Sequence, residues 1–290
     1  MLLPVRKFLA PSISSFARAA AVAAITLAFA AGAVSTGALA VEPGASAWSP
    51  APKSRARLIA AGPLESGAYR AGVEIALDGD ALTYWRNPGD AGVPPEFDFA
   101  GSINLARAEI AYPAPERHDE DGSEVFGWRR NVIFPLKVEP KDAATPVTVA
   151  LNLRYAACEK ICIPSDGQMS LTFTPAMPPT PHGARIAHWT AHVPRPAAEV
   201  GASIALAPIE GAKKPSWRVR VSPAVAGGDL FAEGEDGWFF DTRPLGGDFK
   251  LVLAERPTDA PDLTNVRMTL RRAAGAVEFS TTLDVGKAAP

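Results

Sequence analysis

The chain has 290 residues and a formal net charge of −2, with acidic and basic residues interspersed, so neither a nucleic acid nor an anionic membrane surface is indicated as a partner. Its 28 prolines and 24 glycines divide it into short segments, which favours strands and turns over long helices. Because the length exceeds that of a usual single domain, two domains are expected.

Residues 1–40 have the pattern of a cleaved secretory signal peptide. Arg6 and Lys7 supply positive charge, residues 19–33 form an apolar, alanine-rich segment, and Ala38-Leu39-Ala40 is a small-x-small cleavage site. No later stretch approaches the roughly 20 apolar residues that span a bilayer. The mature chain is therefore expected to be soluble and exported. Its Ala-, Arg- and Pro-rich composition points to a Gram-negative periplasm as the compartment.

Residues 41–66 are rich in Pro, Ala and Ser and predict a flexible lead-in, of which residues 56–61 can join the first strand. Residues 67–175 then carry short, alternating apolar segments separated by turn residues, which predict an antiparallel β-sandwich. The expected strands are Tyr69–Leu77, Ala81–Trp85, Phe97–Phe99, Ile103–Ile110, Val132–Val138, Val147–Tyr155 and Met169–Phe173.

Residues 176–200 are proline-rich and predict a linker with a short helix over residues 184–189. Residues 201–286 again show strand alternation and predict a second, smaller β-sandwich, so that the whole chain is all-β. His188 and His192 in the linker have the i, i+4 spacing of two metal ligands. Because no carboxylate or cysteine accompanies them, no metal site is predicted.

The two cysteines of the chain, Cys158 and Cys162, are the main candidates for chemistry. An alternating strand precedes them, and Pro164 argues against a helix, so the pair is expected at a strand end or the start of a hairpin. A hydrolytic role for a thiolate needs a histidine base, and the first domain has only His118, in a charged segment that reads as a solvated turn. Other hydrolase motifs are absent from the sequence.

Three interpretations of the cysteine pair stay open on chemistry alone. A structural disulfide is one, although closing so short a loop removes little chain entropy. Binding of copper(I) by two thiolates is another, and only Met169 lies close enough in sequence to add a soft ligand. The third is redox exchange, in which Lys160 favours the thiolate and Glu159 opposes it.

Residues 77–173 resemble the N-terminal periplasmic domain of the DsbD-type thiol:disulfide interchange proteins, and most closely the branch that includes ScsB. The motifs that carry the resemblance are Thr83-Tyr-Trp-Arg-Asn-Pro-Gly-Asp-Ala-Gly92, Tyr112-Pro-Ala-Pro-Glu-Arg117, Val125-Phe-Gly127, Phe134-Pro-Leu-Lys-Val138 and Cys158-x-x-x-Cys162-Ile-Pro. The resemblance implies an immunoglobulin-like sandwich whose cysteine pair shuttles electrons without an organic cofactor or a metal.

By the same resemblance, Cys158 and Cys162 are the redox pair, and Phe126-Gly127 form an aromatic–glycine cap that shields it. The other implied site residues are Tyr84 and Trp85 as nearby aromatics, Lys160 as a modulator and Glu124 as an acidic neighbour. The implied partners are a membrane-embedded or thioredoxin-like reductant, acting in trans, and oxidised periplasmic client proteins. Cys162 is expected to form the intermolecular bond. The alternative function is a periplasmic adaptor with a structural disulfide, and a copper-tolerance role is the third.

Overall fold

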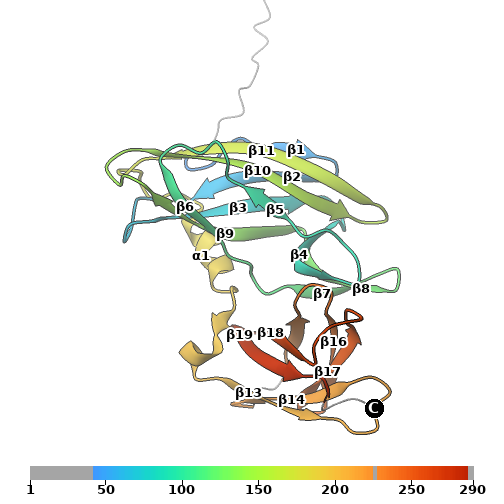
Figure 1. Ribbon diagram of the computed structural model, residues 1–290. Helices are drawn as coiled ribbons and strands as arrows, with labels where there is room; N and C mark the ends of the chain where they lie inside the picture. Colours follow the sequence, from blue (N-terminus) through green and yellow to red (C-terminus); the bar gives the residue numbers. More distant parts are fainter. Residues whose placement is uncertain (1–41, 225–226, 287–290) are drawn as a thin grey trace, which may run out of the picture. The chain divides into compact units, whose positions relative to one another are not determined.

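The computed structural model describes residues 42–224 and 227–286 (Figure 1). The secretory signal peptide predicted for residues 1–40 lies outside these ranges. Strands dominate the described chain, and the prediction of an all-β fold is confirmed.

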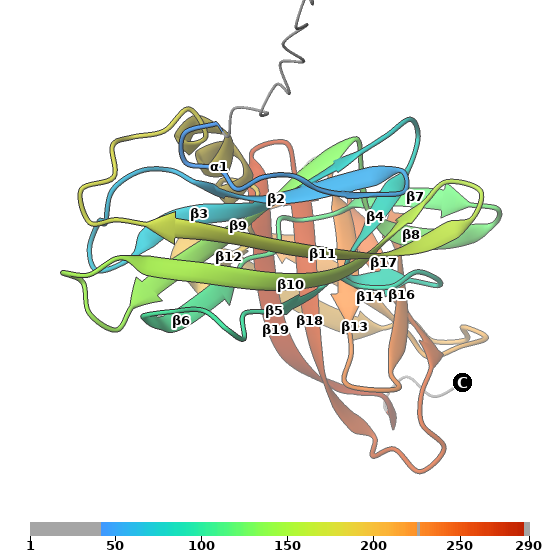
Figure 2. The same cartoon turned by 90° about the horizontal axis from the view of Figure 1, so that it is seen from above.

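Two sheets make up the first sandwich. The first has the order β1 (Ser49–Ala51), β2 (Ser54–Ala60), β3 (Tyr69–Leu77), β9 (Asn131–Pro140), β6 (Leu105–Ile110). The second has the order β11 (Cys162–Phe173), β10 (Val147–Cys158), β4 (Leu82–Gly89), β8 (Ser123–Arg129), β7 (Glu116–Glu120), with β5 (Glu96–Asp98) paired to β10. Strands β10 and β11 run side by side as one long hairpin (Figure 2).

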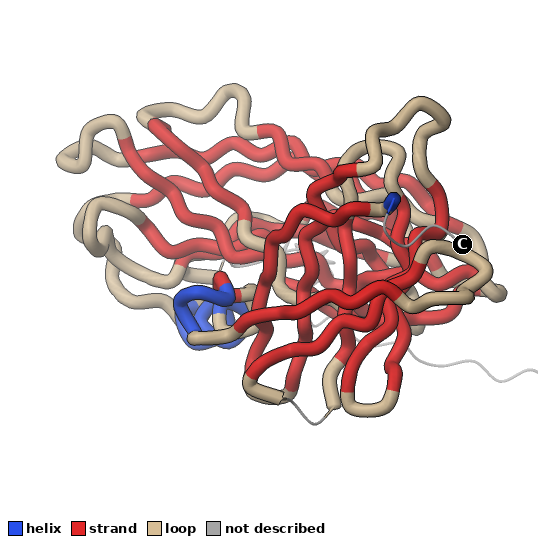
Figure 3. The backbone as a smooth tube through the Cα atoms, turned by 60° about the horizontal axis from the view of Figure 1, so that its bottom comes forward, coloured by secondary structure: helices blue, strands red, loops and turns tan. Residues whose placement is uncertain are grey.

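The one α-helix in the described residues is α1 (Gly183–Thr190), which matches the short helix expected here (Figure 3). Its segment is more than a linker, because Ile186 is buried in a small cluster with Ile59 and Ile133 of the first sandwich. Arg185 also reaches back from α1 and pairs with Glu74 on β3.

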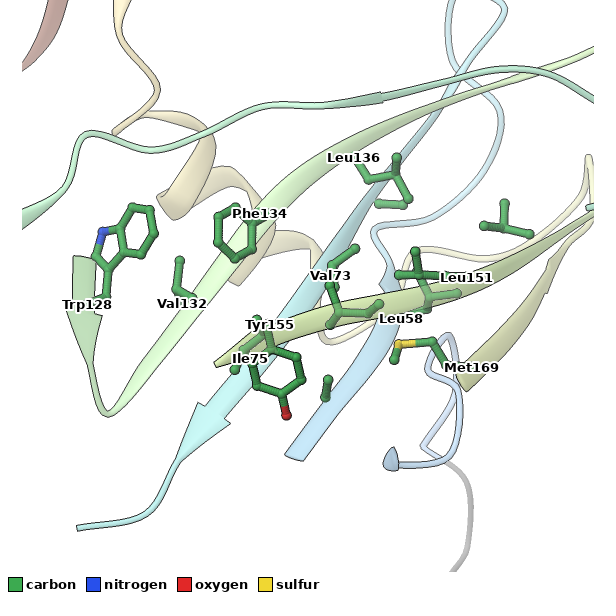
Figure 4. Packing of buried hydrophobic residues seen from close by; sticks show 14 of the residues in the cluster. Leu58, Val73, Ile75, Trp128, Val132, Phe134, Leu136, Leu151, Tyr155 and Met169 are labelled. Atoms are coloured by element: carbon green, nitrogen blue, oxygen red, sulfur yellow. The ribbon is translucent and has the colours of Figure 1, made fainter. Parts of the chain in front are cut away.

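Alternating residues of the two sheets meet in the core of the first sandwich, as the two-residue period of a strand requires (Figure 4). Val73 and Phe134 come from one sheet, and Trp128, Leu151 and Tyr155 from the other. Edge-to-face contacts join Phe134 to Trp128 at 5.3 Å between ring centroids. The position of the two cysteines is therefore set by strands that are fixed in a large apolar core.

Over β2 the structure differs from the flexible lead-in expected for residues 41–66. Leu58 and Ile59 on this strand are completely buried. The charged Arg57 interrupts the apolar pattern in the sequence, but its side chain is itself buried, and its Nε donates to Glu74 at 2.8 Å. The strand thus includes the residues 56–60 that were expected to join it, and its buried charge is neutralised by Glu74.

A second sandwich follows residue 194, again with two sheets. Their orders are β12 (Arg195–Pro196), β19 (Gly275–Asp284), β18 (Leu263–Arg272), β15 (Asp229–Glu233), and β13 (Ser203–Pro208), β14 (Ser216–Ser222), β17 (Asp248–Glu255), β16 (Phe239–Leu245). Trp238 and Phe240 are buried in its core, whereas Phe239 between them is 54% exposed, since neighbouring residues of a strand face opposite sides.

Candidate functional site

The two cysteines close the tip of the β10–β11 hairpin. The strands pair in register from Val147 and Phe173 to the last pair, Cys158 and Cys162, whose Cα atoms are 4.0 Å apart and whose sulfurs form a disulfide. Pro164 is accommodated because β11 is an edge strand, where a missing N–H leaves no central ladder bond unmade. The pair therefore lies at a strand end, as predicted from the alternation before it.

The two sulfurs have different surroundings. Cys158 is only 2% exposed and packs in a small cluster with Leu82, Val125 and Ala156. Cys162 is exposed and follows Ile161, whose side chain is 76% exposed. An external thiol or disulfide can therefore approach the sulfur of Cys162, while that of Cys158 is covered.

Tyr84 on β4 is completely buried beside the disulfide, and its hydroxyl oxygen lies 3.2 Å from Cys162 Sγ. The same hydroxyl donates to Glu120 Oε2 at 2.8 Å. Burial raises the pKa of Tyr84, and the hydrogen bond to Glu120 and its negative charge raise it further. Tyr84 therefore keeps its proton at neutral pH. Because a disulfide sulfur carries no hydrogen, this proton points to Glu120 in the oxidised protein.

Glu120 was not among the candidates from the sequence. Residues 116–121 read as a solvated, charged turn, but Glu116–Glu120 form strand β7, which pairs with β8. The alternation of a strand then places Glu120 at the Tyr84 hydroxyl. The only available signal was the two-residue spacing of Glu116, His118 and Glu120, which is weak without apolar partners. His118 is half-buried, and burial lowers its pKa.

The turn between the cysteines is charged and exposed. Glu159 pairs with Lys53 at 2.9 Å, and the hydrogen bond and charge of Lys53 lower the pKa of Glu159. Lys160 is exposed in the same turn. With Glu159 engaged by Lys53, Lys160 supplies a positive charge within two residues of Cys162.

Phe126 and Trp85 lie in the large core cluster, separate from the small cluster that holds Cys158. Both pack on Phe231 of β15, with ring centroids 4.9 Å and 5.8 Å away. The Arg117 guanidinium lies 5.0 Å from the Phe126 ring and donates to Asp229. Of the four residues expected to shield the pair, the structure thus brings Tyr84 to the sulfur. The shielding role of Phe126 and Trp85 stays a prediction.

Gly127 and Glu124 have other described partners. Gly127 pairs with Tyr84 across β8 and β4, and a side chain there would overlap the carbonyl oxygen of Thr83. The glycine therefore permits the close approach of the strand that carries Tyr84. Glu124 pairs with Arg117 and Arg243. Its predicted role as an acidic neighbour of the cysteines falls geometrically to Glu120.

In residues 42–224 and 227–286, no three or more His, Cys, Asp or Glu side chains are arranged to hold a metal ion. His188 and His192 have ring centroids 4.6 Å apart, and the His192 ring nitrogen Nδ1 lies 2.8 Å from the His188 carbonyl oxygen. No helix in the described ranges has the length and hydrophobicity needed to cross a membrane.

Comparison with known proteins finds one family model and a similar solved structure. Residues 51–174 match the family model described as "Thiol:disulfide interchange protein DsbD, N-terminal". The crystal structure of the N-terminal periplasmic domain of ScsB from Proteus mirabilis is similar with a TM-score of 0.64, at 18% identity, covering 83% of this chain and 99% of that one. At this identity the similarity establishes the fold. No curated protein sequence matches the chain.

Proposed function

We propose that the protein is a periplasmic electron relay that reduces protein disulfides through Cys158 and Cys162, and the premise is the match of residues 51–174 to the family of DsbD N-terminal domains. Thiol:disulfide interchange is the chemistry of the family. The observation that carries the proposal is the asymmetry of the disulfide, with one exposed cysteine and one buried cysteine at the end of a fixed hairpin. Exchange requires this arrangement, because one sulfur must meet the partner and the other must resolve the intermediate.

The reaction is proposed as two successive exchanges. A reductant thiolate attacks Cys162 Sγ, the disulfide breaks, and Cys158 leaves with the electron pair and takes up a proton. The second thiolate of the reductant then attacks the reductant's own sulfur in the mixed disulfide, and Cys162 leaves as a thiolate. In the second exchange the Cys162 thiolate attacks a client disulfide and forms a mixed disulfide with the client. The Cys158 thiolate then attacks Cys162 Sγ and releases the client as a dithiol. Two electrons pass from reductant to client.

Tyr84 and Glu120 are proposed to manage the proton of Cys162. In the reduced protein the Cys162 thiol can donate to the Tyr84 hydroxyl oxygen, which donates to Glu120. When Cys162 loses its proton to the solvent, the Tyr84 hydroxyl can turn from Glu120 toward the sulfur and donate to the thiolate. The raised pKa of Tyr84 keeps the phenol neutral throughout.

A membrane-embedded or thioredoxin-like protein is proposed as the reductant, and oxidised periplasmic proteins as the clients. The support is the family match and the similarity to a periplasmic domain of ScsB. A periplasmic location also fits the secretory pattern of residues 1–40 and the disulfide itself, because disulfides persist in oxidising compartments.

The reduction potential of the Cys158–Cys162 pair tests this proposal. We expect a value of about −180 to −270 mV in a glutathione or dithiothreitol redox buffer, in the range of exchange catalysts. A value below about −300 mV marks an inert structural disulfide and would favour the adaptor function instead. Mass spectrometry of alkylated samples across the buffer series gives the reduced fraction directly.

Replacing the Tyr84 hydroxyl is expected to slow the reaction of Cys162. In the Tyr84→Phe variant the hydroxyl that can donate to the Cys162 thiolate is lost, and the rate constant at pH 7 should fall at least about tenfold. The measurement is the reaction of the reduced protein with a small disulfide reagent followed over pH. Tyr112→Phe is the matched control, because Tyr112 packs on Phe97 and Phe134 in the main core. Equal rates in the two variants would contradict the role of Tyr84.

A further inference from the structure

A short loop that follows β4 is fastened beside the redox site. The backbone N–H of Asp90 donates to the Glu124 carbonyl oxygen at 2.8 Å, and the Glu124 N–H donates to Asp90 Oδ2 at 2.9 Å. Residues 90–93 are nevertheless exposed to solvent. The loop is therefore a surface segment whose path is set by this pair of hydrogen bonds.

Gly92 in this loop lies directly against the ring of Tyr84. A Cβ atom at Gly92 would lie 2.5 Å from Cδ1 and 2.7 Å from Cζ of that ring, well inside van der Waals contact. Its φ of +107° also falls in the region that favours glycine. Two features thus require that position 92 has no side chain. One is the close contact with the Tyr84 ring, and the other is the backbone conformation.

The Cζ atom of the same ring edge carries the hydroxyl that touches Cys162 Sγ and Glu120. Tyr84 otherwise packs in the small cluster with Leu82, Val125 and Cys158. The ring is therefore enclosed by this cluster and by the backbone of Gly92. Any movement of the ring away from Gly92 changes the distance from the hydroxyl to the sulfur.

We propose that Gly92 is a positioning residue for the thiol chemistry, because its backbone closes over the Tyr84 ring and holds the Tyr84 hydroxyl at Cys162. This inference rests on the proposed function for its biological meaning. Its physical content concerns the reactivity of the Cys162 thiol alone, and this can be measured separately from the reduction potential of the pair.

The test uses the full chain with Cys158→Ser, so that Cys162 is the single thiol, and an aromatic disulfide such as dithiodipyridine as the probe. Gly92→Ala is expected to lower the rate constant at pH 7 about tenfold and to raise the pH midpoint of the rate profile. Gly101→Ala is the matched control, since Gly101 has a φ of +85° and no heavy atom within 4 Å of its Cβ position. Its rate constant should be unchanged.

A double-mutant cycle then asks whether Gly92 acts through the hydroxyl. In the Tyr84→Phe background, Gly92→Ala should have little further effect, because the group that it displaces is already absent. Additive effects, or equal effects of Gly92→Ala and Gly101→Ala, would overturn the proposal.

A second variant keeps the test informative if Gly92→Ala unfolds the site. Asp90→Ala removes the side-chain acceptor of the Glu124 N–H and adds nothing near the ring. Asp90→Ala should lower the rate constant of the Cys162 thiol, as Gly92→Ala does, and this effect should disappear in the Tyr84→Phe background. An unchanged rate constant would count against the proposal. A reduction potential below about −300 mV would remove the electron-relay function and leave these rate effects in place.

Discussion

The Cys158→Ser variant is expected to form a mixed disulfide with oxidised glutathione through Cys162, at least about tenfold faster than the Cys162→Ser variant does through Cys158. The reason is access, since Cys162 is exposed and Cys158 is 2% exposed among apolar side chains. Burial in apolar surroundings also disfavours a thiolate at Cys158. Intact-mass spectrometry at timed intervals measures both adducts.

Denatured samples of the two variants provide the control for this comparison, because unfolding exposes both thiols and should bring their rates together. If folded Cys162→Ser reacted as fast as folded Cys158→Ser, the assignment of Cys162 to the intermolecular bond would be wrong. Trapping with an oxidised protein partner would then have to be repeated with Cys158 as the attacking residue.

Removal of Glu74 is expected to destabilise the first sandwich by about 3–5 kcal/mol, the usual result of leaving a buried ionic partner alone. Glu74 is 4% exposed and Arg57 is 6% exposed, and Arg185 of α1 shares the same carboxylate. In Glu74→Ala the Arg57 guanidinium stays buried with only the exposed Glu42 as partner. Denaturant unfolding measures the loss, analysed with a separate transition for each sandwich.

The Glu74 carboxylate also predicts that the stability of the first sandwich depends on pH in the acid range. Burial raises the pKa of Glu74, but the hydrogen bonds and charges of Arg185 and Arg57 outweigh it, so the net pKa is lowered from 4.5. A lowered folded-state pKa stabilises the fold above pH 4.5, and this contribution is lost as the pH falls through the folded pKa. Glu74→Ala should therefore flatten the acid limb of the stability curve. Glu65→Ala, which removes a carboxylate from the exposed pair with Arg70, should leave that limb nearly unchanged.

Alternation of apolar residues was sufficient to predict the strands with clean patterns. Residues 69–77 form β3 with the expected bounds, and the cysteine pair lies at the end of the strand that begins at Val147. The pattern failed where charge is buried or paired. The buried Arg57 lies within β2, of which residues 56–60 were expected to join a strand, and the acidic run at residues 116–120 conceals β7, which brings Glu120 to the site.

Long-range pairing accounts for the rest of what could not be predicted. Tyr84 and Cys162 are separated by 78 positions, and only the sheet order β11, β10, β4 brings the hydroxyl to the sulfur. The shielding role predicted for Phe126-Gly127 stays a prediction, and the contacts of Phe126 depend on Phe231, which lies beyond the matched family segment. No local pattern contains that information.

The register of the hairpin also bears on how readily the disulfide re-forms. Eleven further residue pairs hold β10 against β11, and the Tyr155 hydroxyl near the tip hydrogen-bonds Ser54 Oγ at 2.8 Å. After reduction these contacts keep the two thiols facing each other, which gives each a high effective concentration at the other. Folding of the hairpin has thus already met most of the entropic cost of bringing the two sulfurs together for the disulfide. The lifetime of a mixed disulfide on Cys162 is consequently limited by deprotonation of the buried Cys158, and not by a search of the chain for its second sulfur.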